Sequence, residues 1–255
     1  MVVHIHGVPA FRDNYIWVME DGRNAAAVDP GDAAPVEDFL GKSGLKLAAV
    51  LATHHHADHV GGLPALAAHW KCPTFGPAHE VAAHLDKRLS EGDRITLPGI
   101  GIELSTLDIP GHTAGHIALF GDGMLFCGDT LFTCGCGRLF EGTPPQMVDS
   151  LTKLARLSGD TRVYCGHEYT MANIRFAEAV EPGNPMLAQR KQRDAAKRER
   201  DEPTVPSTIA EELETNPFLR CTEPEVLAAA ERRAGRKLAG PVDVFAEIRG
   251  WKNAF

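Results

Sequence analysis

The stretch THHHADH, residues 53–59, places four histidines and one aspartate within seven positions. Imidazole nitrogens and carboxylate oxygens bind divalent metal ions in proteins. Along an extended chain, residues two positions apart project to the same side, so His54 and His56 can bind one ion while His55 faces away. We therefore expect His54 and His56 to be metal ligands, and His55 to form a hydrogen bond or to pack against its neighbours.

Other His and Asp residues follow predicted strands. Apolar runs and alternating patterns predict strands at 47–53, 102–109 and 162–165 and a hairpin at 117–129. A His or an Asp stands at or just after each of them. Functional side chains of layered α/β proteins gather at strand ends, because the loops there converge on one edge of a rigid sheet. The candidate ligands are His54, His56, Asp58, His59, His112, Asp129 and His167.

Seven ligands are too many for one four-coordinate ion, but they suit two ions that share one carboxylate. Asp58 and His59 open the predicted helical segment 58–70, displaced from the first histidine pair, which favours a second ion beside the first. We expect Asp129 and a water molecule to bridge the two ions. The predicted ligand sets are His54, His56 and His112 for one ion, and Asp58, His59 and His167 for the other.

Two metal ions held about 3.5–4 Å apart supply a hydroxide at neutral pH and polarise the carbonyl group that it attacks. The sequence contains no Ser-His-Asp elbow, no phosphate-binding loop and no G-x-G-x-x-G that opens a helix. The predicted chemistry is therefore hydrolysis. Mixed imidazole and carboxylate ligands suit zinc, iron(II) or manganese, and the spacing does not select among them.

The sequence pattern changes after about residue 170, where no further strand-like alternation is seen. Strand patterns alternate with helical ones before it, whereas residues 188–202 are charged and helical, and capping-box spacing at Thr208 and Thr222 predicts two more helices. We predict an α/β catalytic domain at 1–167 and a small, mainly α-helical domain at 168–255.

The composition disfavours two classes of binding partner and indicates a cellular compartment. A net charge of −8 disfavours a general binder of nucleic acid or of anionic membranes. The chain shows no signal-peptide pattern and no apolar run of transmembrane length, so we expect a cytoplasmic protein, and a monomer. Its six cysteines form no C-x-x-C, which indicates reduced thiols. Cys134 and Cys136 fit a packed tight turn better than a soft metal site.

Four stretches in this order, THHHADH, PGHTAGH, GDTLF and GHEYT, resemble the metallo-β-lactamase superfamily. Further stretches along the chain, PAFRDNYIWV, GCGRLFEGT, EPGNP and EPTVPSTIAEE, together with a basic C-terminus, are similar to the hydroxyacylglutathione hydrolases, or glyoxalase II. The resemblance implies a four-layer αβ/βα sandwich with two metal ions at one edge. It also implies hydrolysis of S-D-lactoylglutathione to glutathione and D-lactate, a step of methylglyoxal detoxification.

The resemblance also implies roles for individual residues. In the family, the glutathione portion of the substrate is held by side chains at the positions of Arg138, Tyr169, Arg249 and Lys252. Some members carry Tyr where Phe140 stands, so one substrate hydrogen bond is expected to be missing here. Without the resemblance, the two C-terminal cations would be read as a solvated basic tail.

The resemblance and the metal chemistry together assign the catalytic carboxylates. We expect a metal-bridging hydroxide to attack the thioester carbonyl. Asp58 would orient this hydroxide and accept its proton, and Asp129 would bridge the metals.

Three other functions fit part of this pattern. A lactonase or β-lactamase of the same fold would need no glutathione contacts. A glutathione-persulfide dioxygenase works with a single iron, whereas Asp58, His59 and His167 here supply a second ligand set. A metal-storage or sensor protein is disfavoured by a mixed His and Asp site that leaves room for water.

Overall fold

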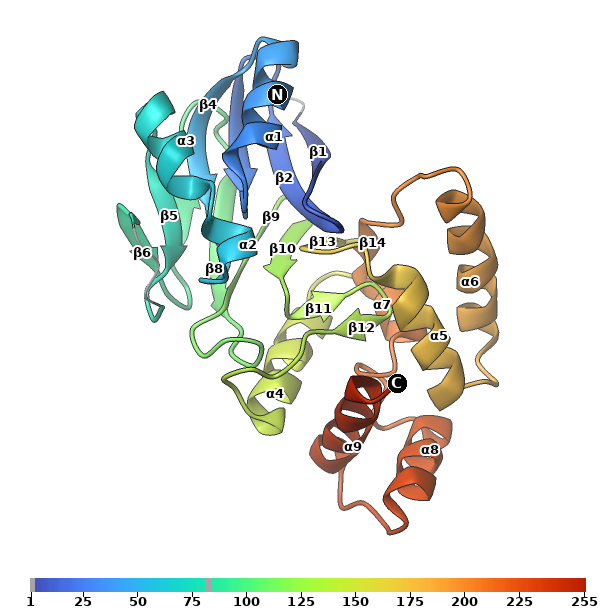
Figure 1. Cartoon of the computed structure of the whole chain (residues 1–255). Helices are drawn as coiled ribbons and strands as arrows, with labels where there is room; N and C mark the ends of the chain where they lie inside the picture. The colour runs from blue at the N-terminus through green and yellow to red at the C-terminus, as the bar shows by residue number, and fades with distance from the viewer. Residues whose placement is uncertain (1–2, 81–83) are drawn as a thin grey trace. The chain divides into compact units, whose positions relative to one another are not determined.

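The computed structural model describes residues 3–80 and 84–255 (Figure 1). These residues pack as two units, one made of residues 1–108 and 113–128 and the other of 109–112 and 129–255. We call them the first and the second unit. This division describes packing, whereas the predicted domain boundary after residue 167 follows the sequence pattern and stays a prediction.

The first unit is built mainly from strands. Its elements are β1 (His4–Ala10), β2 (Asn14–Glu20), β3 (Asn24–Val28), α1 (Ala33–Ser43), β4 (Lys46–Leu51), α2 (Ala57–Val60), α3 (Leu63–Trp70), β5 (Thr74–Pro77), β6 (Lys87–Leu89), β7 (Arg94–Thr96), β8 (Glu103–Asp108), β9 (Ile117–Gly121) and β10 (Met124–Gly128). Strands β1–β6 form a mixed sheet in chain order, antiparallel from β1 to β3 and parallel from β3 to β6. Strands β7–β10 pair antiparallel in chain order.

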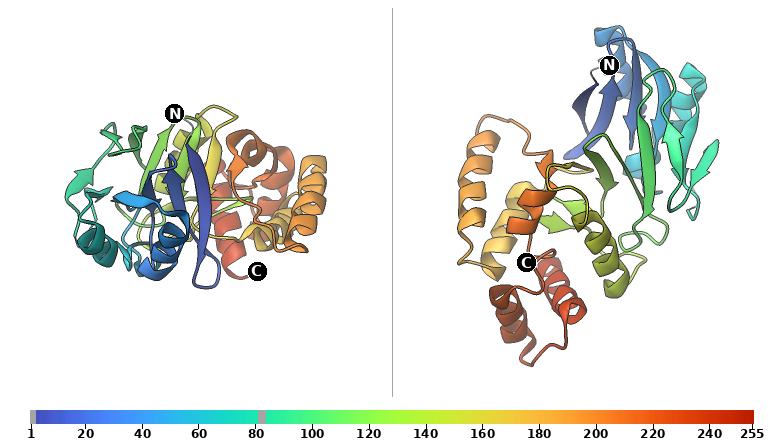
Figure 2. Two further views of the ribbon diagram at one scale, coloured as in Figure 1. Left: turned by 90° about the horizontal axis from the view of Figure 1, so that it is seen from above. Right: turned by 180° about the vertical axis from the view of Figure 1, so that it is seen from behind.

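Both faces of the mixed sheet are covered. Side chains alternate between the two faces of a strand, and in β2 Val18 and its neighbour Met19 are both fully buried. Val18 packs in one core with Val36 and Leu40 of α1 and with Leu66 of α3. Figures 1 and 2 show α1 and α3 on one side of this sheet and strands β8–β10 on the other side. This layering explains why residues 47–51 read as a continuous apolar run rather than an alternating one.

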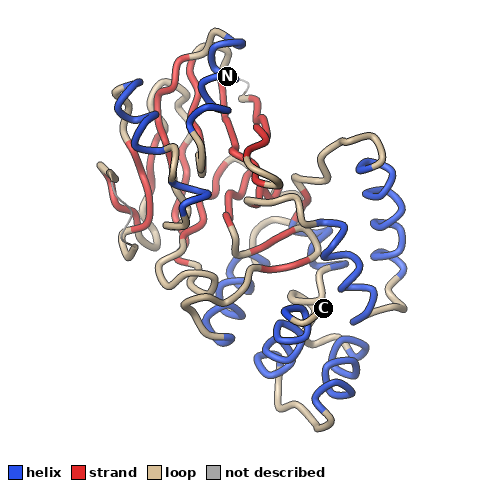
Figure 3. The backbone as a smooth tube through the Cα atoms, in the orientation of Figure 1, coloured by secondary structure: helices blue, strands red, loops and turns tan. Residues whose placement is uncertain are grey.

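The second unit is mainly helical, as the tube in Figure 3 shows for the C-terminal part of the chain. Its elements are β11 (Leu131–Phe132), β12 (Gly135–Cys136), α4 (Pro144–Ala155), β13 (Arg162–Cys165), α5 (Thr170–Val180), α6 (Pro185–Arg198), β14 (Ser207–Thr208), α7 (Ile209–Thr215), α8 (Pro224–Ala234) and α9 (Pro241–Asn253). Helix α5 packs on α6, and α9 packs on α4 and α8. Among the described residues, no helix is long and apolar enough to cross a membrane.

The predicted elements are present with small shifts of their ends, and three details were wrong. The segment 58–70 is not one helix, because Gly61 and Gly62 separate α2 from α3. Thr222 does not cap α8, whose N-cap is Glu223. A short strand, β14, follows residue 170 and pairs with β13. The cap predicted at Thr208 is confirmed, since its side chain accepts a hydrogen bond from the Glu211 backbone N–H.

A buried ion pair joins the helices of the second unit. Arg190 of α6 and Glu212 of α7 are almost completely buried, and the guanidinium donates to Glu212 Oε1 at 2.6 Å. Glu212 Oε2 also accepts from the Cys134 backbone N–H at 2.8 Å and from Asn216 Nδ2 at 2.9 Å. The pair therefore also fixes the β11–β12 hairpin.

We expect Glu212→Ala to lower the free energy of unfolding by about 3–5 kcal/mol, because it leaves the Arg190 guanidinium buried without its main counter-charge. Urea denaturation measures this loss. Asp38→Ala is the control, since Asp38 forms an exposed ion pair with Lys42 and should change stability little. A loss for Glu212→Ala as small as that of the control would contradict the expectation.

Candidate metal centre and substrate pocket

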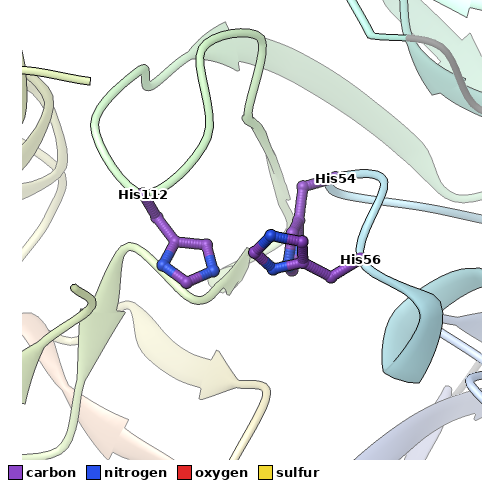
Figure 4. A group of neighbouring side chains, drawn as sticks. All are labelled: His54, His56 and His112. Carbon is purple, nitrogen blue, oxygen red and sulfur yellow. The ribbon is translucent and has the colours of Figure 1, made fainter. Parts of the chain in front are cut away.

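The loop after β4 places two predicted ligands side by side in the first unit. His54 is fully buried, and its Nε2 lies 3.2 Å from Nδ1 of His56. Two ring nitrogens at this separation can bind one ion. Figure 4 draws these two rings on the loop that follows β4, together with His112 on the loop that follows β8.

The next ligand pair belongs to the short helix α2. His59 is buried, and its Nε2 lies 3.6 Å from Asp58 Oδ2. On the other side of the ring, His59 Nδ1 lies 3.1 Å from Asp29 Oδ2. An Nδ1–H donated to this carboxylate leaves a lone pair on Nε2 that can bind a metal ion, the arrangement found for metal-bound histidines. Asp29 also accepts from the Thr53 backbone N–H and hydroxyl, each at 2.7 Å.

Asp58 is held by the β1–β2 hairpin. Asn14, which is buried, donates through Nδ2 to Asp58 Oδ2 at 3.0 Å and to the Asp58 backbone oxygen at 3.3 Å. A Cβ on Gly31 would lie 1.9 Å from the same backbone oxygen, so only glycine fits there. The half-exposed carboxylate of Asp58 is thus fixed by the hairpin and by the close approach of Gly31.

The remaining two histidines near these ligands have supporting contacts. His55 Nδ1 lies 3.0 Å from Glu80 Oε2, within ion-pair distance, and the interpretation of His55 as a hydrogen-bonding or packing residue stays a prediction. His116 is fully buried, and its ring stacks on His54 with centroids 4.5 Å apart. Its Nδ1 lies 3.0 Å from the Ile117 backbone oxygen, so this nitrogen carries the hydrogen.

Three predicted ligands meet in the second unit. His112 Nε2 lies 3.5 Å and His167 Nε2 lies 3.3 Å from the same oxygen, Oδ2 of Asp129. His112 donates its Nδ1–H to the Arg138 backbone oxygen at 2.9 Å, so its Nε2 carries a lone pair that can bind a metal ion. One oxygen of Asp129 therefore lies within 3.5 Å of two imidazole nitrogens.

These donor sets fit divalent metal ions. All seven predicted ligands offer imidazole nitrogen or carboxylate oxygen, and most of them are buried. Such mixed sets without thiolate suit first-row ions such as zinc, iron(II) and manganese. The prediction of a metal-binding His and Asp cluster therefore agrees with the structure.

A pocket of about 410 Å³ opens beside Asp129 within the second unit. His112 and Asp129 form part of its lining, and three aromatic side chains, Phe132, Phe140 and Tyr169, form another part. The Tyr169 ring stacks on the His167 ring with centroids 4.7 Å apart, and the Phe140 ring meets His112 edge to face at 5.3 Å. The aromatic side chains of the pocket are thus in contact with two predicted ligands, His112 and His167.

Three cations line the same pocket: Arg138, Arg249 and Lys252. Arg249 is 5% exposed and donates to the Cys136 backbone oxygen at 2.7 Å, so the alternative of a solvated tail is wrong for this residue. Lys252 Nζ donates to Asn173 Oδ1. Burial lowers the pKa of Lys252 to about 8, and the neighbouring Arg249 charge lowers it too. These cations make the pocket attractive to an anionic molecule.

The cysteines beside the pocket are packing residues. Cys134 and Cys136 are buried in the β11–β12 hairpin, and Cys134 has a left-handed backbone with φ of 59°. Burial raises the pKa of the Cys134 thiol to about 12 and also raises that of Cys136, so both thiols stay protonated at neutral pH. The packed-turn interpretation is confirmed.

Two family models match the chain. Residues 10–167 match the metallo-beta-lactamase superfamily, and residues 168–255 match the hydroxyacylglutathione hydrolase C-terminus. The chain belongs to the hydroxyacylglutathione hydrolase family. It is 52% identical to the hydroxyacylglutathione hydrolase of Nitrosomonas europaea, covering 100% of this chain and 97% of the relative. It is 57% identical to that of Alkalilimnicola ehrlichii, covering 99% of each.

A solved structure shows the same fold. The B3 metallo-β-lactamase BLEG-1 superposes with a TM-score of 0.64 at 22% identity, covering 86% of this chain and 99% of that one. The predicted metallo-β-lactamase fold with a helical C-terminal domain is confirmed, as is the resemblance to the hydroxyacylglutathione hydrolases. The chain is an enzyme of that family, a glyoxalase II hydrolase.

Sequence reasoning missed several supporting residues. Asp29 follows the end of β3 directly, so the strand-end pattern that gave the ligands could have found it. Asn14 and Glu80 carry no such signal. Asn173 lies inside α5, and only the fold brings its side chain to Lys252 and to the Thr133 backbone oxygen.

We expect Asp29→Asn to weaken metal binding by about 10- to 100-fold, because the amide cannot accept from the Thr53 N–H, the Thr53 hydroxyl and His59 Nδ1 at once. Titration of the metal-free chain with zinc and a competing chelator measures the change. Asp32→Asn is the matched control, since Asp32 only caps α1. Equal zinc affinities of Asp29→Asn and of the wild type would contradict the assigned role.

Proposed function

We propose that the chain hydrolyses S-D-lactoylglutathione, and other S-(2-hydroxyacyl)glutathiones, to glutathione and a 2-hydroxy acid at a dinuclear metal site. One observation carries the proposal: a single pocket joins the His112 and Asp129 ligands to three cations. Such a pocket suits a substrate with a reactive carbonyl at one end and carboxylates at the other.

We propose that two divalent ions, zinc in the first place and otherwise iron or manganese, bind the seven predicted ligands. His54, His56 and His112 would hold one ion, and Asp58, His59 and His167 the other, with Asp129 shared. The contacts of Asp129 with both His112 and His167 support its shared role. When bound, such a pair supplies a hydroxide at neutral pH and polarises the thioester carbonyl.

The protein's own groups would orient the reaction. Asp58, fixed by Asn14, can accept a hydrogen bond and a proton from the nucleophilic water. The leaving group is the glutathione thiolate, whose reference thiol pKa is about 8.5, so the reaction needs no strong general acid.

The cationic pocket would bind the glutathione portion. Arg138, Arg249 and Lys252 can pair with its carboxylates, and the Tyr169 hydroxyl can donate a hydrogen bond. Phe140, which is 63% exposed, offers only an apolar ring. The local positive charge accounts for anion binding by a chain whose net charge is −8.

The cellular setting belongs to the same proposal. A role in methylglyoxal detoxification, a cytoplasmic location and a monomeric state remain predictions. Size-exclusion chromatography with light scattering would test the last of these.

The deciding experiment follows loss of the S-D-lactoylglutathione thioester by ultraviolet absorbance, with the metal content measured on the same sample. We expect turnover with about two metal ions per chain, abolished by chelation and restored by zinc or iron. A fully metallated sample that leaves this thioester intact but opens lactones or β-lactams would overturn the substrate assignment. Oxygen consumption with glutathione persulfide would instead indicate a dioxygenase.

We expect Arg249→Ala to raise KM by about 10- to 100-fold with little change in kcat, because a charged hydrogen bond of about 1.5–3 kcal/mol is lost in both ground state and transition state. Steady-state kinetics measure both constants. The control is Arg233→Ala, since Arg233 lies over the Trp251 ring outside the pocket. An equal fall in kcat and kcat/KM would refute a pure binding role.

We expect Phe140→Tyr to lower KM by about 2- to 10-fold, because the added hydroxyl can supply one hydrogen bond of about 0.5–1.5 kcal/mol to glutathione. Phe255→Tyr is a matched control, since Phe255 is equally exposed and does not line the pocket. An unchanged KM for Phe140→Tyr would show that this position does not face the substrate.

We expect KM to rise as the pH increases through about 8, the pKa of Lys252. Below this pH the ammonium is charged and attracts a carboxylate, and above it the neutral amine does not. Kinetics from pH 6.5 to 9 measure the effect. The variant Lys252→Met should show a high KM without this rise, and the same pH dependence in both proteins would assign it to another group.

A further inference from the structure

A buried glutamate in the first unit is used neither as a metal ligand nor as a pocket residue. Glu80 lies in the segment after β5, and its side chain is 2% exposed. Arg88 donates to its backbone oxygen at 2.9 Å, which fixes the Glu80 main chain. A carboxylate buried this deeply is costly unless several donors satisfy it.

The Glu80 carboxylate contacts two separate chain segments. Its Oε2 lies 3.0 Å from Nδ1 of His55. Its Oε1 accepts from the Thr113 hydroxyl and from the Gly115 backbone N–H, the latter at 3.2 Å. One side chain thus ties the loop after β4 to the turn before β9.

The turn before β9 packs directly on the Glu80 segment. A Cβ on Gly115 would lie 2.6 Å from Glu80 Cγ and 2.8 Å from the His79 backbone, so a larger residue would push the turn away. In the same turn, the His116 ring stacks on the ring of His54. The turn and the loop are therefore in contact through both Glu80 and this histidine pair.

The residues that Glu80 holds are the chain neighbours of predicted ligands. His55 stands between His54 and His56, and Thr113 directly follows His112. A shift of His55 or Thr113 by a few tenths of an ångström must therefore also shift these ligands. Metal ions bind tightly only when their ligands are already held near the required geometry.

We propose that Glu80 is a positioning residue that fixes the three predicted ligands of one metal ion, His54, His56 and His112. The inference rests on the dinuclear site of the proposed function. Glu80 acts through its contacts with His55, Thr113 and Gly115 and does not itself bind the ion. His55 takes part as well, because it lies between His54 and His56 in the chain and its ring contacts the Glu80 carboxylate.

Glu80→Gln is the sharpest variant, because it keeps the volume and replaces one acceptor oxygen by an amide donor. The amide oxygen can still accept from the Thr113 hydroxyl and the Gly115 N–H, but the uncharged amide cannot form the ion-pair contact that the carboxylate makes with His55. Zinc titration of the metal-free full chain against a chromophoric chelator gives the affinity of each of the two ions. We expect the affinity for one zinc to fall about 10- to 100-fold, and the affinity for the other to stay close to that of the wild type.

The kinetic readout separates positioning from substrate binding. At low zinc, kcat of Glu80→Gln should fall, and excess zinc should restore it with KM unchanged. Thr113→Val, which loses only the hydroxyl, should show a smaller loss of the same zinc affinity. The control is Glu181→Gln, since Glu181 is a buried acid of the second unit that pairs with Arg220 and contacts no predicted ligand. It should lower stability and leave both zinc affinities unchanged.

Two outcomes would overturn the inference: wild-type affinities for both ions in Glu80→Gln, or equal losses for both ions that follow a loss of thermal stability. The wild-type chain tests the proposed function in the same series. Tight binding of two zinc ions without hydrolysis of S-D-lactoylglutathione would refute the proposed substrate, and the comparison of Glu80→Gln with the wild type would still decide the role of Glu80.

Discussion

A metal ligand is effective only when its second polar atom is also held, and this constraint runs through the whole site. An imidazole has two nitrogens, and the one that does not bind metal must donate its hydrogen to a fixed acceptor. For two of the predicted ligands such an acceptor is present: Asp29 for His59 and the Arg138 backbone oxygen for His112. The Asp29 carboxylate is itself held, because it accepts from the Thr53 backbone N–H and hydroxyl.

Rigidity comes from the strands that the acceptors follow. Asp29 stands one residue after β3, and its backbone N–H donates to the Leu51 oxygen at the end of β4. Its carboxylate accepts from the Thr53 backbone N–H. The parallel pairing of β3 with β4 thus places this carboxylate next to the metal-binding loop. A sheet that is packed on both faces holds this carboxylate in place, because its strand ends cannot move independently.

In the second unit, two cations of the pocket, Arg249 and Lys252, are held in place by hydrogen bonds. The Glu212 carboxylate accepts from the Cys134 backbone N–H of the β11–β12 hairpin. The backbone oxygen of Cys136 in the same hairpin accepts from the Arg249 guanidinium. Asn173 accepts from Lys252 on another side of the pocket. Neutral groups thus hold two pocket cations, so the charges of these cations remain available to a carboxylate of the substrate.

The His and Asp clusters could be predicted from the sequence because their signals are local. Strand periodicity fixes where each strand ends, and spacing of two along an extended chain separates His54 and His56 from His55. Family resemblance located the pocket residues, and the structure places Arg138, Phe140, Tyr169, Arg249 and Lys252 along one cavity.

The tertiary structure alone decided which groups support the ligands and which charges are buried. Asn14 reaches Asp58 across 44 positions and Lys252 reaches Asn173 across 79, distances at which no periodic pattern in the chain carries information. Arg249 is buried because α9 packs on α4 and α8 in the second unit. The sequence without the family resemblance indicated only a solvated basic tail at this position. Strand and helix patterns record short-range backbone geometry, whereas hydrogen bonds between distant segments exist only after the layers have packed.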